Sequence, residues 1–356
     1  METLKSLIAN CIYPLAAFAV SMILTRICIT VLPHLGYMDM PKGRHIHKKP
    51  VPRAGGIGFI LAFWFSIILY AGKLCKGDFT KLADQNVGQF LIALAGASLI
   101  LFFTGLYDDR FDMPSVIKLM LHIAAGATLY FLGGGIRTLF DCTLPWYVAL
   151  IVTVCWTIGI VNAFNLIDGL DGLAAGLASI SSVCIAVWIL LSGGNFPMVV
   201  LLFTFCGACL GFLVFNYSPA RIFMGDTGSM FLGFMLSGIS VVGVVKSAAM
   251  IALVVPMLAL GIPIFDTTFA IVRRKRAGVP IMKPDKGHLH HRLLNLGFTQ
   301  RQAVLLMYVI SALLGISAVA MTEVSPKMAL FIFVAVIFTV LYGAKRLGIF
   351  KTAAMK

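Results

Sequence analysis

The sequence predicts an all-α protein, a polytopic membrane helical bundle of about eleven transmembrane helices built as one domain over residues 1–356. Two observations lead to this prediction. First, 60% of the residues are hydrophobic and only 12% are charged, with a mean hydropathy of +0.98, about half of the charge that a soluble domain carries. Second, apolar runs of about 20 residues recur along the chain, and this length crosses a hydrocarbon core about 30 Å thick.

The expected helices follow one another along the chain, and we find no internal repeat and no domain boundary. The eleven apolar runs are 8–31, 54–72, 87–107, 117–134, 144–162, 171–191, 197–216, 229–245, 248–271, 303–321 and 327–344. The first run follows a short polar flank without the pattern of a cleavable signal peptide. We therefore expect a first helix that stays in the membrane.

The charges orient this bundle. The net charge is +14, which by itself would suit a nucleic-acid partner, but the positive residues lie in alternate connections. Of 28 Lys and Arg residues, 19 fall on one side and 7 on the other, and the remaining two, Arg26 and Lys118, are near helix ends. By the positive-inside rule, the richer side is cytoplasmic. The N-terminus is then outside and the C-terminus inside the cell, and no nucleic acid is expected.

The acidic residues gather on that same side. Nine of the fourteen belong to the predicted cytoplasmic face: Asp39, Asp108, Asp109, Asp112, Asp168, Asp171, Asp226, Asp266 and Asp285. Carboxylates follow the positive-inside rule only weakly, so another cause is needed. None is expected at the bilayer midplane, where transport pathways usually carry ionisable groups. We therefore expect the chemistry of this protein on its inner face.

Five inner loops carry polar clusters, over residues 33–56, 108–118, 162–172, 216–229 and 272–302. The first contains Arg44-His-Ile-His-Lys-Lys-Pro-Val-Pro-Arg-Ala-Gly-Gly. Such a basic loop is either an anchor for anionic lipid headgroups or a phosphate-binding loop in which Lys48 and a glycine pair meet the ligand. The glycine pair favours the second interpretation.

The second cluster is DDRFD, which starts at Asp108, and Lys118 follows ten residues after that aspartate. Adjacent carboxylates repel one another, and a hard divalent cation such as Mg²⁺ relieves that repulsion. The ordinary alternatives are a solvated acidic turn and a lysine that only extends to the interface. The DDRFD stretch therefore indicates either a metal–phosphate site or a polar helix end.

The third and fourth clusters each precede an apolar helix. Asn165, Asp168 and Asp171 are spaced by three, so a helical start would place them on one face, although one helix cap would need only one of them. In the fourth cluster, Asp226 stands in Gly-Asp-Thr-Gly-Ser, where backbone amides and a carboxylate at a helix start suit a phosphate and its metal ion.

The fifth cluster is basic and rich in histidine: His288, His290, His291 and Arg292 follow a lysine-rich and arginine-rich stretch. A zinc site is disfavoured because no cysteine is near and the neighbours are cations. The side chains can instead bind phosphate or a sugar hydroxyl, or form a basic face on the inner leaflet. Together the five clusters combine acidic metal ligands with basic phosphate binders, as phosphoryl-transfer sites do.

Four of these motifs also resemble a known family. DDRFD at 108–112, NAFNLIDGLDG at 162–172, FMGDTGS at 223–229 and GHLHH at 287–291 resemble the polyprenyl-phosphate N-acetylhexosamine-1-phosphate transferase superfamily, in the family's order and over nearly the whole chain. The H-x-H-H pattern followed by RLLNLGFTQRQA looks like the branch that uses N-acetylglucosamine. Where relatives often have Gln after the lysine of the second cluster, this chain has His122.

The resemblance implies a reaction and its partners. N-acetylglucosamine 1-phosphate would pass from UDP-N-acetylglucosamine to undecaprenyl phosphate, releasing UMP, as the first membrane step of envelope glycan synthesis. The implied cofactor is Mg²⁺, with Mn²⁺ as an alternative, and the implied location is the bacterial cytoplasmic (inner) membrane with the site on its cytoplasmic face. A homodimer is left open. The alternatives are a phospho-N-acetylmuramoyl-pentapeptide transferase and a non-enzymatic transporter of lipid-linked sugars.

The resemblance also implies roles for single residues. Asp226 and Asn165 match the metal-binding positions, Asp108 and Asp109 the essential acidic pair, and Asp168 and Asp171 the nucleotide-side carboxylates, of which Asp168 is expected to be catalytic. The expected substrate-binding residues are Lys48, Lys118, Asp171, His288, His290, His291 and Arg292.

Overall fold

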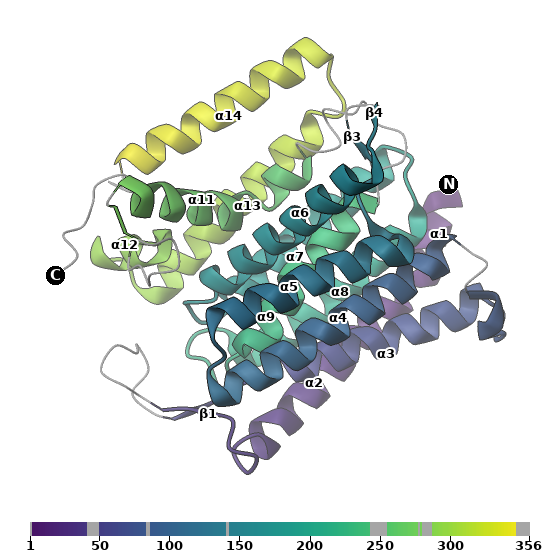
Figure 1. Cartoon of the computed structure of the whole chain (residues 1–356), viewed down its shortest axis with the longest axis horizontal. Helices are drawn as coiled ribbons and strands as arrows, with labels where there is room; N and C mark the ends of the chain where they lie inside the picture. The colour runs from purple at the N-terminus through teal and green to yellow at the C-terminus, as the bar shows by residue number, and fades with distance from the viewer. Residues whose placement is uncertain are drawn as a thin grey trace.

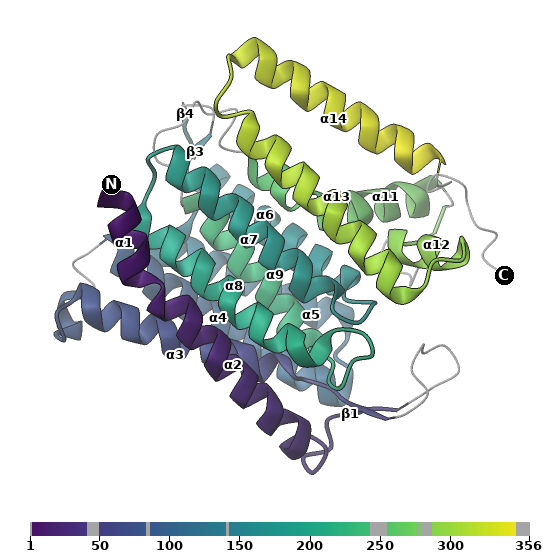
Figure 2. The ribbon, with the colours of Figure 1, turned by 180° about the vertical axis from the view of Figure 1, so that it is seen from behind.

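A computed structural model of the chain shows a bundle of long helices with two very short hairpins (Figures 1 and 2). It describes residues 2–40, 50–82, 86–139, 142–242, 255–276, 278–279 and 287–346. The helices of the first half are α1 (Glu2–Asn10), α2 (Ile12–Val31), α3 (Gly56–Leu74), η1 (Phe79–Leu82), α4 (Asn86–Phe111), α5 (Ser115–Leu129), η2 (Tyr130–Gly134) and α6 (Trp146–Ile167).

The second half continues in the same way. Its helices are α7 (Leu173–Leu191), α8 (Phe196–Asn216), α9 (Gly225–Val242), α11 (Gly261–Arg276), α12 (Leu289–Asn295), α13 (Gln300–Ala320) and α14 (Pro326–Arg346). The strands are β1 (Met38–Asp39) with β2 (Val51–Pro52), and β3 (Thr138–Leu139) with β4 (Cys142–Thr143), both pairs antiparallel.

The predicted membrane bundle is confirmed. Within the described residues, nine helices are long and apolar enough to cross a bilayer. They correspond to nine of the eleven predicted runs. The other two, 229–245 and 248–271, pass through residues 243–254, which lie outside the described ranges. Their described parts are α9, a helical stretch at 255–259, and α11.

Helix α9 forms the centre of the bundle. Between Met230 and Ser240 its side chains are at most 1% exposed, and Phe231 packs against Phe59, Phe63 and Phe205 of the neighbouring helices. Such aromatic pairs prefer tilted or edge-to-face geometry, as they have here. The packed core therefore holds α9 in place, and the candidate site lies at the start of this helix.

Glycines let some helices approach closely. A Cβ on Gly207 would lie 2.2 Å from the carbonyl oxygen of Pro14, and one on Gly211 would lie 2.4 Å from that of Phe18. Both glycines are on α8 and face α2. Small residues at helix interfaces are typical of membrane bundles, in which packing rather than the hydrophobic effect holds the helices together.

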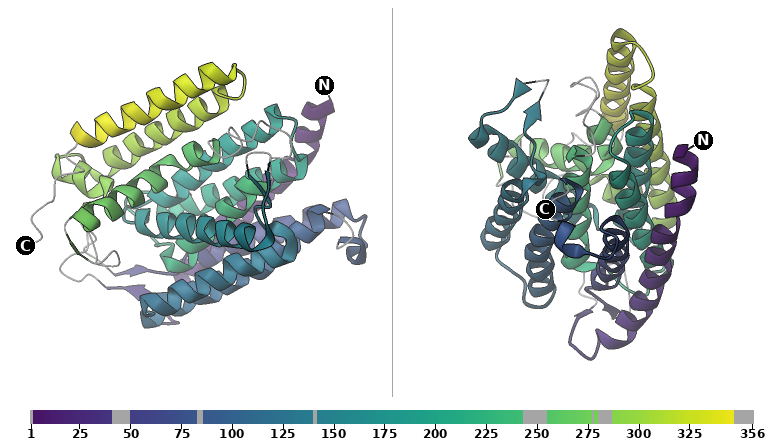
Figure 3. Two further views of the ribbon diagram at one scale, coloured as in Figure 1. Left: turned by 45° about the horizontal axis from the view of Figure 1, so that its top comes forward. Right: turned by 90° about the vertical axis from the view of Figure 1, so that its right-hand side faces the viewer.

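The two ends of the bundle differ. The N-terminus lies at the end that carries β3 and β4, whereas β1, α12 and the end of α14 lie at the opposite end (Figures 1 and 2). Helices α13 and α14 run side by side along one flank (Figure 3). We call the end with β1 and α12 the site end. The prediction that the site end faces the cytoplasm stays a prediction.

Candidate active site

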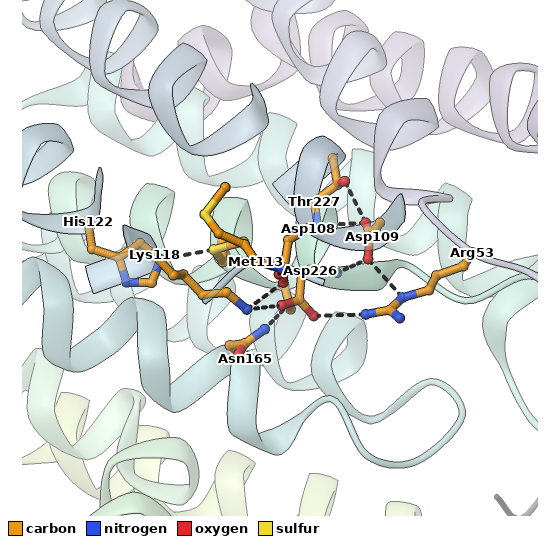
Figure 4. A network of polar contacts seen from close by, with 11 residues as sticks. Arg53, Asp108, Asp109, Met113, Lys118, His122, Asn165, Asp226 and Thr227 are labelled. Atoms are coloured by element: carbon orange, nitrogen blue, oxygen red, sulfur yellow. Dashed lines mark hydrogen bonds and ion pairs between the residues drawn. The ribbon is translucent and has the colours of Figure 1, made fainter. Parts of the chain in front are cut away.

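Three of the five predicted loops meet around Asp226, the second residue of α9. Residues 52–56 run beside residues 223–224: Phe223 N donates to Pro52 O at 2.8 Å, and Gly55 N donates to Phe223 O at 2.8 Å. This backbone pairing brings Arg53 to the start of α9. The end of α4 and the start of α5 complete the arrangement (Figure 4).

The carboxylates and cations in this cluster alternate. Arg53 Nε lies 2.8 Å from Asp109 Oδ1, and Arg53 Nη2 lies 3.4 Å from Asp226 Oδ1. Lys118 Nζ lies 2.6 Å from Asp226 Oδ2 and also contacts Asp108 Oδ2. Asp226 therefore bridges the two cations. Three carboxylates meet two cations, which leaves one formal negative charge in excess.

Asp109 is held from all sides. Its oxygens accept hydrogen bonds from Asp226 N at 2.8 Å, Thr227 N at 3.0 Å and Thr227 Oγ1 at 2.6 Å. These amides belong to the first turn of α9, so Asp109 caps that helix from α4. Its side chain is fully buried. The predicted catalytic role of Asp109 is untested, and this environment favours a role in positioning.

Glycine makes this contact fit. Gly225 has φ +71°, and a Cβ there would lie 2.4 Å from Asp109 Oδ2. A Cβ on Gly105 would likewise lie 2.4 Å from Thr227 Cα. The glycine of the Met-Gly-Asp-Thr-Gly pattern thus lets α4 approach α9 closely, and a larger residue at this position would prevent that contact.

Asp108 and Asp226 are the more accessible carboxylates. Asp108 accepts a hydrogen bond from Met113 N at 2.6 Å through its other oxygen, and its side chain is 7% exposed. The Asp226 side chain is 19% exposed. Burial acts to lower the pKa of Arg53, but the charges of Asp109 and Asp226 raise it above its ordinary value, so the guanidinium stays charged.

The third loop lies next to this cluster. Asn165 Nδ2 donates to Ser229 Oγ at 3.0 Å, which holds the end of α6 against α9 (Figure 4). Asp171 Oδ2 accepts a hydrogen bond from Ala220 N at 3.0 Å and so joins the third loop to the fourth. The metal role predicted for Asn165 and the substrate role predicted for Asp171 are untested.

Asp168 ends α6 and faces the same charges. Burial, and then the negative charges of Asp226 and Asp109, raise its pKa to about 8. A carboxyl group that keeps its proton near neutral pH in a polar cluster is a candidate acid or base, which suits the catalytic role predicted for Asp168.

The fifth loop reaches the third loop through His290. His290 is 2% exposed, and a Cβ on Gly169 would lie 2.6 Å from its Nε2. Burial and the neighbouring His291 lower the pKa of His290 to about 3, so this ring is neutral. His290 is therefore an uncharged ring that packs against Gly169, next to Asp168 in the sequence.

The other predicted residues of the fifth loop are close by. His288 stacks parallel to His290 with ring centroids 5.7 Å apart, and His291 lies 4.3 Å from His290. Arg292 Nε donates to Gly287 O at 3.1 Å. The histidine-rich motif is thus compact, and its predicted role in substrate binding is untested.

His122 is buried in α5, one turn after Lys118. Its Nε2 lies 3.0 Å from the Met230 sulfur, and its Nδ1 has no hydrogen-bond partner in the part of the chain that the structure describes. The polar residue at this position therefore faces α9 just below the cluster.

One predicted residue cannot be placed, and two others were missed. Lys48 lies outside the described residues. Within the described part of the first loop, Arg53 is the cation that reaches the carboxylates; its place directly before the Ala-Gly-Gly turn was the available signal. Asp266, which accepts a hydrogen bond from His288, was recognised only as one acid of the inner face.

The cluster fits a magnesium ion that arrives with a phosphate. Within the described ranges, no three His, Cys, Asp or Glu side chains form a metal cage by themselves. Mg²⁺ usually binds through one or two carboxylates together with substrate phosphates and water. Asp226 and Asn165 offer the hard oxygen atoms that this mode needs, and the excess negative charge favours a cation.

A helical membrane bundle with a cluster of alternating carboxylates and cations at one end has the groups that membrane enzymes acting on phosphates need. Residues 91–244 match the family described as glycosyl transferase family 4. The chain is a member of this family.

Several relatives cover most of the chain. A Bacillus subtilis (strain 168) protein named "Probable undecaprenyl-phosphate N-acetylglucosaminyl 1-phosphate transferase" is 39% identical over 90% of this chain and 89% of its own length. "Decaprenyl-phosphate N-acetylglucosaminephosphotransferase" of Mycolicibacterium smegmatis is 36% identical over 77% of this chain and 72% of its own length. "Undecaprenyl-phosphate alpha-N-acetylglucosaminyl 1-phosphate transferase" of Escherichia coli K12 is 30% identical over 80% of this chain and 76% of its own length.

Proposed function

We propose that this protein transfers N-acetylglucosamine 1-phosphate from UDP-N-acetylglucosamine to undecaprenyl phosphate. An oxygen of the lipid phosphate attacks the phosphorus attached to the sugar. The bond from that phosphorus to the bridging oxygen of the diphosphate breaks, and UMP leaves with that oxygen. The lipid product is undecaprenyl-diphospho-N-acetylglucosamine. The names of the relatives support the donor sugar and the lipid acceptor.

The observation that carries this proposal is the cluster in which Asp226 bridges Arg53 and Lys118. Phosphoryl transfer needs little covalent help from the protein and depends on positioning and charge stabilisation. Both cations are partly exposed, at 29% and 20% of their side chains. They can therefore exchange a carboxylate contact for a phosphate oxygen without leaving their places.

We propose Mg²⁺ as the cofactor, held by Asp226 and by the amide oxygen of Asn165, with Mn²⁺ as a substitute that also accepts oxygen ligands. When bound, the ion supplies charge stabilisation to the diphosphate and to the UMP leaving group. Asp226 is already next to both cations, so it orients the phosphate groups relative to them.

Asp108 is the carboxylate we propose to orient the lipid phosphate. It lies in the last turn of α4, its side chain is 7% exposed, and it contacts Lys118, so both groups can meet the same phosphate. A phosphate monoester is largely ionised near neutral pH, and little proton removal is needed. Asp109 holds α9 and Arg53 in place. The stacked histidines and Arg292 line the neighbouring wall and bind the donor.

We further propose that the site end faces the cytoplasm and that the protein resides in the bacterial cytoplasmic membrane. The concentration of Lys and Arg at the site end supports this orientation. The acceptor lipid would then reach Asp108 sideways from the inner leaflet. Every residue named above comes from one copy of the chain, and a homodimer stays a prediction that light scattering of the purified protein can test.

The test is an assay of UMP release. The purified full chain, in lipid nanodiscs, is mixed with undecaprenyl phosphate, Mg²⁺ and one UDP-sugar at a time. We expect UMP from UDP-N-acetylglucosamine, and none when Mg²⁺ is removed by a chelator. Asp226→Asn should lower kcat by at least about 100-fold, as loss of one charge-stabilising group does, while Glu323→Gln at the opposite end should not change it.

The rival functions give different results in the same assay. UMP from UDP-N-acetylmuramoyl-pentapeptide alone would replace the proposed donor. UMP from no donor would favour a transporter of lipid-linked sugars. Full activity of the Asp226→Asn variant would contradict the proposed role of Asp226 in the reaction.

A further inference from the structure

Asp266 is a buried acid with no role in the reaction as described above. It lies in the middle of α11 and is 4% exposed. A carboxylate in such a place is unfavourable unless charged or polar groups compensate it. Its partners therefore indicate why the helix carries an acid here.

Each oxygen of Asp266 has one partner in the fifth loop. Oδ2 lies 2.8 Å from Nδ1 of His288, and Oδ1 accepts a hydrogen bond from Leu289 N at 2.7 Å. Leu289 is the first residue of α12, and the side chain of the N-cap residue, His288, makes no capping hydrogen bond. Asp266 thus caps α12 and holds the His288 ring from a different helix.

This contact fixes the state of the His288 ring. An ionised carboxylate can only accept hydrogen bonds, so Nδ1 of His288 carries the proton. The remaining nitrogen, Nε2, is then the atom that can meet a ligand. The His288 ring is parallel to that of His290, with an interplanar angle of 5°, and His290 in turn packs on Gly169 beside Asp168.

We propose that Asp266 is a positioning residue for the transfer reaction, because it presents Nε2 of His288 to the diphosphate–sugar part of the donor. This inference rests on the proposed function. Asp266 does not touch substrate itself. It acts through His288, as carboxylates behind functional histidines commonly do by fixing tautomer and orientation.

The variant Asp266→Asn tests this with little change in shape. The amide oxygen can still accept from Leu289 N, while the amide nitrogen faces Nδ1 of His288 and favours the opposite tautomer. We expect kcat/KM for UDP-N-acetylglucosamine to fall by about tenfold to hundredfold, with a thermal midpoint close to that of the wild type. Thr268→Ala is the matched control, because Thr268 is exposed on the same helix and its hydroxyl donates to the backbone oxygen of Ile264, one turn earlier.

A double-variant cycle separates positioning from a purely structural role. His288→Gln should lower kcat/KM by a similar factor, and adding Asp266→Asn to it should cause no further loss. The proposal would be overturned if the double variant lost kcat/KM by the product of the two single-variant factors. It would also be overturned if the kcat/KM of the single Asp266→Asn variant were within twofold of that of the wild type.

The proposal can still be tested if the variant does not fold, and its failure can be told apart from a failure of the proposed function. If Asp266→Asn does not fold, the same cycle with Asp266→Glu keeps the charge and displaces it, and its loss should again vanish in the His288→Gln background. If the wild type itself releases no UMP from UDP-N-acetylglucosamine, the proposed function fails. If the wild type is active and the cycle is multiplicative, only the role of Asp266 fails.

Discussion

At the scale of single residues, Arg53 governs the electrostatics of the candidate site. It is the only cation in Figure 4 that contacts Asp109, and it also reaches Asp226. Asp109 is fully buried, and a buried charge that loses its partner is strongly destabilising. Arg53 therefore supports the fold around α9 and, in the proposed reaction, would also bind phosphate.

We expect Arg53→Gln to lower kcat/KM by about 100-fold or more, because one charged donor to the phosphates is lost. The thermal midpoint should also fall, because Asp109 loses its counterion; the loss of stability is about 3 kcal/mol or less, given the partial exposure of Arg53. The control is Arg137→Gln, because Arg137 is exposed and lies at the end of the bundle opposite to the site. Wild-type kinetics of the Arg53 variant would contradict the role.

Asp168 gives the site a dependence on pH. Its pKa is raised from 3.8 to about 8 in the folded protein. The folded state therefore holds one more proton than the unfolded state between these two values. It follows that this group stabilises the fold at low pH, and that its contribution is lost as pH rises towards 8.

We expect Asp168→Asn to flatten this dependence, because the amide resembles the protonated carboxyl group. Without Mg²⁺ and donor, the thermal midpoint of the wild type should fall from pH 5 to pH 8 more than that of the variant. The difference corresponds to at most about 1.4 kcal/mol per pH unit. Parallel curves for the two proteins would show that Asp168 is already ionised at pH 5.

At the scale of elements, the start of α9 organises the site. Asp109 caps it from α4, residues 52–56 pair with the chain just before it, and Asn165 holds Ser229 from α6. The buried side chains of α9 anchor this end in the core. The helix therefore brings Asp226 to the cations through packing rather than through local sequence.

Gly225→Ala tests this arrangement. The new Cβ would meet Asp109 Oδ2 at 2.4 Å at a backbone φ of +71°, so both strain and a clash arise. We expect a loss of stability of about 2–4 kcal/mol and a fall in activity of at least tenfold. Gly343→Ala on α14, where the added Cβ meets nothing within 4 Å, should leave both the melting temperature and the UMP assay unchanged.

At the scale of the whole molecule, the two ends of the bundle have different chemistry. Cys142 is exposed on β4, at the end opposite to the site. Arg221 is exposed in the fourth loop at the site end. These two positions report the orientation of the bundle in the membrane.

Cys11 and Cys155 are also exposed, so the experiment starts from a variant in which both are changed to Ser. In right-side-out vesicles we expect a membrane-impermeant maleimide to label Cys142 of this variant from outside, and a further Cys142→Ser change to abolish that signal. A cysteine introduced by Arg221→Cys in the Cys142→Ser background should react only after the vesicles are opened. The reverse pattern would place the site outside and contradict the predicted orientation.

Much of this architecture could be predicted from the sequence, because hydropathy is a local property. Nine apolar runs became helices of membrane-spanning length, and the resemblance named the family to which the chain belongs. The acidic motifs lie at helix ends, where their glycines and polar residues indicated breaks. Three of the five predicted loops, with Asp108, Asp109, Lys118 and Asp226, meet in one cluster.

The pairing of these residues was not available from the sequence. Arg53 and Asp226 are 173 residues apart, and Lys118 and Asp226 are 108 apart, so their contacts depend on how whole helices pack. For the same reason Asp109 became a cap for a distant helix, and Asp266 the partner of His288. The sequence by itself determined a membrane bundle and the chemical groups at one end of it. Only the tertiary structure decided which carboxylate meets which cation, because helix packing and close glycine contacts set those distances.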